Sequence, residues 1–127
     1  MSKILISTES RFPVNKKLMR ETVENFLEQQ KVKADIEVSI LVVGDRKMRE
    51  LNNKYRKLDH TTPVLTFAQE EGKAFVSPPD KILRIGDIVI SYPQTVLMAR
   101  DENKMVDQKI TDLVSHGLSN LFGLTSL

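Results

Sequence analysis

Apolar residues recur along this chain with two different periods, and the changes between them divide it into helices and strands. Over residues 14–30 the apolar side chains are spaced three and four apart, which predicts a helix with one buried face. Residues 36–40 alternate between apolar and polar side chains and continue into Leu41, Val42 and Val43. Because its end is apolar on both faces, this run predicts a strand in the centre of a sheet.

The same patterns predict the remaining elements. Short β-branched or alternating runs indicate further strands at 3–7, 63–68 and 85–91. Helical spacing predicts a short helix at 46–57 with Asp45 as its N-cap, a helical connection starting at Tyr92 and Pro93, and a mostly buried helix over 105–121. Residues 69–84 are predicted to form a long loop or an irregular hairpin. This order favours an α+β fold with helices packed on a small mixed sheet.

The composition indicates one compact domain spanning 1–127, because 127 residues with 40% hydrophobic content supply a single core. There is no cysteine, which excludes a disulfide framework, a thiolate metal site and a cysteine nucleophile. No segment reads as a signal peptide or reaches the apolar length of a membrane span. We therefore expect a cytoplasmic protein without a membrane partner, whereas the sequence does not determine its oligomeric state.

Positive charge is concentrated in the predicted short helix at 46–57. The net charge is only +2, so the distribution of charge carries more information than its sum. Such a cluster could form a stripe that binds the backbone of RNA, or could simply keep an exposed helix solvated. The basic residues are Arg46, Lys47, Arg49, Lys54, Arg56 and Lys57.

Three motifs in order give the chain a specific resemblance. Residues 51–59 read Leu-Asn-Asn-Lys-Tyr-Arg-Lys-Leu-Asp, residues 61–67 read Thr-Thr-Pro-Val-Leu-Thr-Phe, and residues 85–91 read Ile-Gly-Asp-Ile-Val-Ile-Ser. Together they resemble the YbeY family, bacterial metal-dependent endoribonucleases implicated in ribosomal RNA maturation. The resemblance implies a YbeY-like fold with ribosomal RNA or the ribosome as partner. It also makes Arg56 a candidate catalytic residue, since an arginine can clamp a phosphate with two hydrogen bonds.

The end of the chain departs from the family's metal-binding motif, His-Gly-x-Leu-His-Leu-x-Gly-Tyr-Asp-His. His116 matches the first histidine, whereas Asn120 and Ser126 stand at the positions of the other two, and Thr125 replaces the aspartate. The resemblance implies zinc, with His116 as a ligand and catalytic residue. One imidazole, one amide oxygen and one hydroxyl are a weak donor set for zinc, so we expect no tightly held ion. RNA or another chain could complete a site.

These observations leave three readings of the function. In the first, the protein is a single-strand endoribonuclease that uses a metal-activated water, provided that the metal site is retained. In the second, it is a non-catalytic RNA- or ribosome-binding pseudoenzyme that kept the fold and the basic surface. In the third, the divergence from residue 120 onward reflects an altered or truncated reading frame.

The sequence also predicts the surroundings of four further residues. Asp59 is expected either to orient Arg56 or to form a turn with His60, which we interpret as a surface residue. Asp87 is expected to make a structural hydrogen bond to a loop, because a carboxylate in an apolar strand needs a partner. Phe67 is expected to belong to the core.

Overall fold

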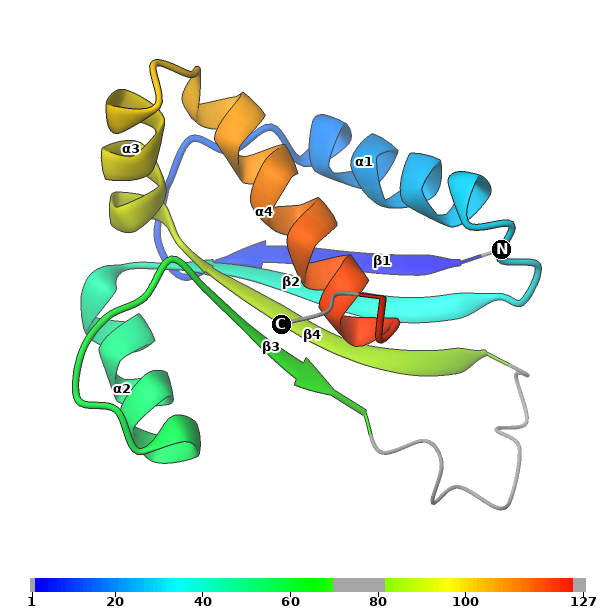
Figure 1. Ribbon diagram of the computed structural model, residues 1–127, viewed down its shortest axis with the longest axis horizontal. Helices are drawn as coiled ribbons and strands as arrows, with labels where there is room; N and C mark the ends of the chain where they lie inside the picture. Colours follow the sequence, from blue (N-terminus) through cyan, green and yellow to red (C-terminus); the bar gives the residue numbers. More distant parts are fainter. Residues whose placement is uncertain (1, 70–81, 125–127) are drawn as a thin grey trace.

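The computed structural model describes residues 2–69 and 82–124 of the chain (Figure 1). These described residues contain four strands and four helices in an α+β arrangement, as the sequence predicts. In chain order they are β1 (Lys3–Thr8), α1 (Lys16–Gln29), β2 (Ile36–Val43), α2 (Asp45–Arg56), β3 (Val64–Ala68), β4 (Leu83–Ser91), α3 (Tyr92–Asp101) and α4 (Val106–Leu121).

The strands form one mixed sheet in the order β1-β2-β4-β3. β2 pairs in parallel with both β1 and β4, which confirms its predicted central position, and β3 runs antiparallel to β4 at one edge. The register between β2 and β4 shifts at Glu37 and Val38, opposite Gly86. Gly86 has a φ of 142°, and a Cβ there would lie 2.3 Å from the carbonyl oxygen of Phe67, so glycine is required at this point.

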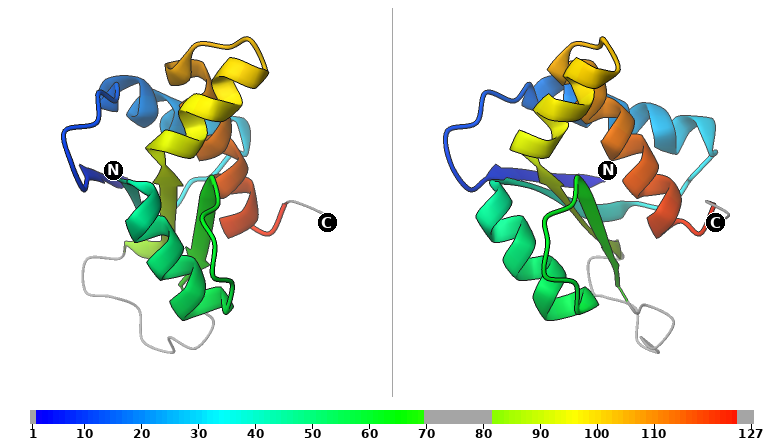
Figure 2. Two further views of the ribbon diagram at one scale, coloured as in Figure 1. Left: turned by 90° about the vertical axis from the view of Figure 1, so that its left-hand side faces the viewer. Right: turned by 60° about the vertical axis from the view of Figure 1, so that its left-hand side comes forward.

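Helices cover the two faces of the sheet unequally. α1 and α4 lie on one face and α2 on the other, while α3 follows β4 and packs against α4 (Figures 1 and 2). The face under α1 and α4 holds the larger core, because alternate strand residues point into it. Its fully buried members include Met19, Val23, Ile40, Ile88, Ile90, Ile110, Val114 and Leu118.

The smaller core lies between the sheet and α2. Val43 and Val89 contribute to it from the central strands, and Met48 from α2. This explains the apolar end of β2: Val42 faces the larger core, and the next residue, Val43, faces the smaller one. α2 is short and does not cover the whole of this face. Leu5 of β1, which lies on the same face, is 52% exposed.

Several predicted boundaries move in the structure. β4 begins at Leu83, two residues before the predicted start, and residues 70–81 of the predicted loop lie outside the described residues. Asp45 is not an N-cap: Gly44 holds that position without a side-chain hydrogen bond, and Asp45 is the first helical residue. Within the described residues, no helix is both long and apolar enough to cross a membrane.

Candidate functional site

The connection from α2 to β3 is held in place by a buried asparagine. Asn52 is only 2% exposed, and its Nδ2 donates to the carbonyl oxygen of His60 at 2.9 Å. The backbone carbonyl oxygen of Asn52 accepts a hydrogen bond from the backbone amide of Leu58. Between them, Lys57 ends the helix in the left-handed conformation with a φ of 62°. A buried amide must be paired, so Asn52 fixes the path by which the chain leaves the basic helix.

Arg56 is fixed against the edge strand β3. Its Nη2 donates to the carbonyl oxygen of Thr66 at 2.7 Å, and the guanidinium carbon lies 4.9 Å from the centre of the Phe67 ring. The side chain remains exposed, and a guanidinium has five N–H groups, so donors remain available to a phosphate oxygen. β3 therefore fixes the position of the guanidinium without neutralising its charge.

Asp59 pairs with Arg49 and not with Arg56, which corrects one of the two expectations for this carboxylate. Nε and Nη2 of Arg49 donate to its two oxygens at 2.8 and 3.1 Å. Hydrogen bonding to Arg49, and then its positive charge, lower the pKa of Asp59 below its ordinary value. Arg49 is thereby partly neutralised, and Arg46 lies 3.8 Å from the carboxylate of Glu50.

The basic residues do not form one stripe. Arg46 and Arg49 line an open cavity with Asp45, Asp59, His60 and Thr61. Lys47 points instead into a second cavity, and Lys54 lies 5.1 Å from the centre of the Tyr55 ring beside it. The cations therefore divide between two sides of α2: Lys47 and Lys54 lie on one side, and Arg49 and Arg56 on the other, since residues seven apart are about two helical turns apart. Among the described residues, Lys47, Lys54 and Arg56 have no ion pair.

The second cavity, named here the aromatic pocket, has a volume of about 350 Å³ and lies between α2 and the sheet. Tyr55 and Phe67 form its aromatic wall, with ring centroids 5.2 Å apart in an edge-to-face arrangement. Phe67 is half-buried: it packs against the smaller core, as expected, and it also lines this cavity. The lining residues are Ser39, Leu41, Lys47, Leu51, Tyr55, Phe67, Asp87 and Val89.

Asp87 lies in the middle of β4 at the rim of the aromatic pocket. It pairs in register with Ser39 on β2 and with Phe67 on β3. The hydroxyl of Ser39 donates to its Oδ1, so its partner is a neighbouring strand and not the expected loop. The carboxylate is exposed, and Ser39 fixes its orientation.

His116 lies on α4, in the layer opposite to α2. His116 and Asn120 are both exposed and stand one helical turn apart, so they project from the same side of the helix. Ser126 and Thr125 lie outside the described residues. The two candidate catalytic residues therefore belong to different layers: Arg56 contacts β3 from the α2 side, and α4 packs on the opposite sheet face.

These donors do not fit a zinc ion. His116 supplies one imidazole and Asn120 a neutral amide oxygen, whereas zinc sites use three or four histidine, thiolate or carboxylate ligands. The described part of the chain contains no group of three histidine, cysteine, aspartate or glutamate side chains that could hold a metal. His116 and Asn120 alone therefore supply too few donors to hold zinc.

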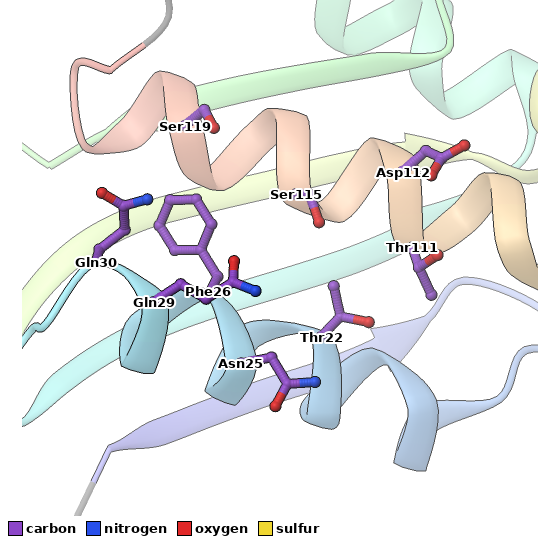
Figure 3. A pocket seen from close by; sticks show the side chains of 9 residues that line it. All are labelled: Thr22, Asn25, Phe26, Gln29, Gln30, Thr111, Asp112, Ser115 and Ser119. Atoms are coloured by element: carbon purple, nitrogen blue, oxygen red, sulfur yellow. The ribbon is translucent and has the colours of Figure 1, made fainter.

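A third cavity lies between α1 and α4 and contains none of the predicted site residues. Its volume is about 340 Å³, and Figure 3 shows neutral polar side chains from the two helices facing it. Its one charged residue, Asp112, accepts a hydrogen bond from Lys104 at 2.7 Å. A lining without a cation does not suit a phosphate, so we do not regard it as a nucleic-acid site.

The comparisons with known proteins agree with the motifs. The sequence model of the family described as Endoribonuclease YbeY matches residues 5–125. The chain belongs to this family. Over 111 aligned residues it is 36% identical to the Endoribonuclease YbeY of Roseiflexus sp. (strain RS-1). The aligned region covers 87% of this chain and 69% of that relative. Over 128 residues it is 30% identical to the Endoribonuclease YbeY of Dehalococcoides mccartyi (strain CBDB1), which covers 94% of this chain and 77% of that one.

The fold is also similar to a solved structure. The solution structure of TM1509 from Thermotoga maritima superposes with a TM-score of 0.62 at 25% sequence identity, covering 93% of this chain and 71% of that one. The predicted resemblance to YbeY is thus confirmed in sequence and in fold. YbeY endoribonucleases are metal-dependent, and this contrasts with the donor set around His116.

Two parts of this region could not be assigned from the sequence. The polar residues at Ser39 and Asp87 look like ordinary outward positions of alternating strands, and only the strand register makes them neighbours. Phe67 reads as a core residue because its motif is apolar. The one available signal was the spacing of Lys47, Leu51 and Tyr55, which places all three on one side of α2.

Proposed function

We propose that this chain is an endoribonuclease of the YbeY type that acts in the maturation of ribosomal RNA. The observation that carries the proposal is the family match over residues 5–125. The partner is then RNA, either free or within the ribosome, and the place of action is the cytoplasm. We further infer that residues 1–127 form a single YbeY-like domain.

The arrangement of Arg56 supports a role in holding the phosphate backbone. Phosphate contacts supply most of the affinity of proteins for RNA, and a guanidinium held by Thr66 and Phe67 loses little freedom when it binds one. Lys47 and Lys54 add positive charge along the other side of α2, where Lys47 lines the aromatic pocket, and Lys57 follows at the end of the helix. Arg46 and Arg49 are weaker candidates, because Glu50 and Asp59 offset their charges.

His116 is proposed to act on the α4 side of the edge strand. Its imidazole is exposed and therefore accessible to a substrate. Zinc is the metal that the family resemblance implies, but His116 with Asn120 does not fit it. A zinc site here would need donors from RNA or from another chain, and we assign no reaction step to it.

Cleavage of a single-stranded ribosomal RNA fragment labelled at one end tests the proposal. The wild-type protein should produce internal cuts, whereas Arg56→Ala should cut at least tenfold more slowly because a phosphate contact is lost. Arg100→Ala is the matched control, since Arg100 is likewise an exposed arginine in the last turn of a helix, and it belongs to α3 and not to α2. Its rate should equal that of the wild type.

The same assay distinguishes the pseudoenzyme reading. RNA that remains intact with every divalent metal supplied, while binding to the protein is retained, would contradict the nuclease and leave a non-catalytic RNA-binding protein. His116→Ala provides a second comparison: it should lower the cleavage rate without weakening RNA binding. An unchanged rate would remove His116 from the site.

A further inference from the structure

The aromatic pocket has an aromatic wall and an acidic rim. One wall consists of the rings of Tyr55 and Phe67, and each ring has a cation over it: Lys54 at 5.1 Å from the Tyr55 centroid and Arg56 at 4.9 Å from the Phe67 centroid. Tyr55 is 51% exposed despite its apolar neighbours. A large ring left half in water beside fixed cations is typical of a surface on which nucleic-acid bases stack.

The part of the rim next to Phe67 is acidic. Asp87 on β4 is the register partner of Phe67 on β3, and the Ser39 hydroxyl donates to its Oδ1, which leaves Oδ2 without a hydrogen-bond partner among the described residues. A carboxylate repels a phosphate group, but it accepts hydrogen bonds from the N–H groups on the edge of a base. The pocket is therefore suited to a base, and Lys47, Lys54 and Arg56 near it are cations available to the phosphates of the same strand.

We propose that the aromatic pocket binds one unpaired nucleobase of a single-stranded RNA, stacked on Tyr55 and with its edge toward Asp87. The proposal rests on the proposed function, because it takes RNA as the substrate. The volume of about 350 Å³ is within the range of small-ligand pockets. Leu41, Leu51 and Val89 form an apolar floor that a planar base would cover.

A base inside a duplex cannot reach this pocket, since its faces are stacked and its edge is paired. The pocket thus selects for single-stranded segments, loops and unpaired ends of a folded RNA. This selection depends on the base and not on the backbone, so it is separable from the contact made by Arg56.

Two versions of a short single-stranded RNA separate these contributions: one with all its bases, and one in which a single central nucleotide is abasic. The wild-type protein should bind the complete strand roughly tenfold more tightly, because stacking of one base on an aromatic ring contributes about that factor. Tyr55→Leu should abolish the difference by weakening the complete strand alone. Leu97→Ala, which truncates a 40% exposed apolar residue on α3, should leave the difference unchanged.

A second measurement does not depend on affinity. A 2-aminopurine placed at the central position should lose fluorescence when it stacks in the wild-type pocket and should keep it with Tyr55→Leu. Equal wild-type affinity for the two strands, or an equal loss of affinity for both with Tyr55→Leu, would overturn the pocket and leave the proposed function intact. Absence of wild-type binding to either strand would instead overturn the proposed function.

Discussion

The carboxylate of Asp45 connects three segments that are far apart in the sequence. It accepts hydrogen bonds from the hydroxyls of Thr61 and Ser91 at 2.9 and 2.8 Å and from the side-chain amide of Gln94 at 3.2 Å. From the sequence, Asp45 is a good N-cap because aspartate before a helical run usually is one. Partners that lie 16 to 49 residues away cannot be inferred from a local pattern.

Asp59 and Arg49 give a prediction on pH at the same scale. Because Arg49 lowers the pKa of Asp59, this carboxylate stabilises the folded state at pH values above its ordinary pKa of about 4, and the contribution is lost as the pH falls through the lowered value. Carbon-detected NMR titration should therefore show Asp59 protonating at lower pH than in Arg49→Gln. The same midpoint in both proteins would contradict the pairing. Both residues are exposed, so the effect on overall stability should be small.

The substitutions around His116 give a second residue-scale prediction. Asn120→His combined with Ser126→His restores the three imidazoles of the family motif, and imidazole is a far better zinc donor than an amide or a hydroxyl. The purified double variant should carry about one zinc per chain after dialysis, and the wild type much less. Asn120→Gln with Ser126→Thr is the matched control. A double-histidine variant that retains no zinc would contradict an inherited site on α4.

At the scale of elements, hydrophobic periodicity predicted the described strands and helices well, because each buries one face or one stripe. The central position of β2 followed from Val42 and Val43, which face different cores. The start of β4 was missed because Leu83 and Arg84 read as part of a Pro- and Gly-containing loop. Their pairing with Ile36 and Glu37 is a long-range feature that no single segment encodes.

The packing of α4 on β4 depends on the absence of a side chain at Gly117. A Cβ at this position would lie 2.9 to 3.1 Å from three atoms of Ile88, which is fully buried and stiff at χ1. Gly117→Ala gains about 1 kcal/mol in helix propensity, but overpacking costs about 1–3 kcal/mol. We expect urea unfolding to show a net loss of roughly 1 kcal/mol. Ser115→Ala in the same helix should change the stability by less than about 0.5 kcal/mol, and a more stable Gly117→Ala would contradict this packing.

At the scale of the whole molecule, the sheet separates two surfaces with different chemistry. The α2 side holds Arg56, Lys47 and the aromatic pocket, and the α4 side holds His116 and Asn120. Family motifs in the sequence identified Arg56 and His116 one by one. Their placement on either side of β3 depends on the order β1-β2-β4-β3, which brings the chain's third strand to the edge.

The RNA-binding role of the α2 side is tested most sharply by locating the RNA on the protein. A single-stranded RNA containing 4-thiouridine can be photo-crosslinked to the wild-type protein and the attached residues identified by mass spectrometry. We expect crosslinks on the α2 side of the sheet, concentrated at Tyr55 and Phe67. Crosslinks confined to α1 and α3, with none on α2 or β3, would contradict this role.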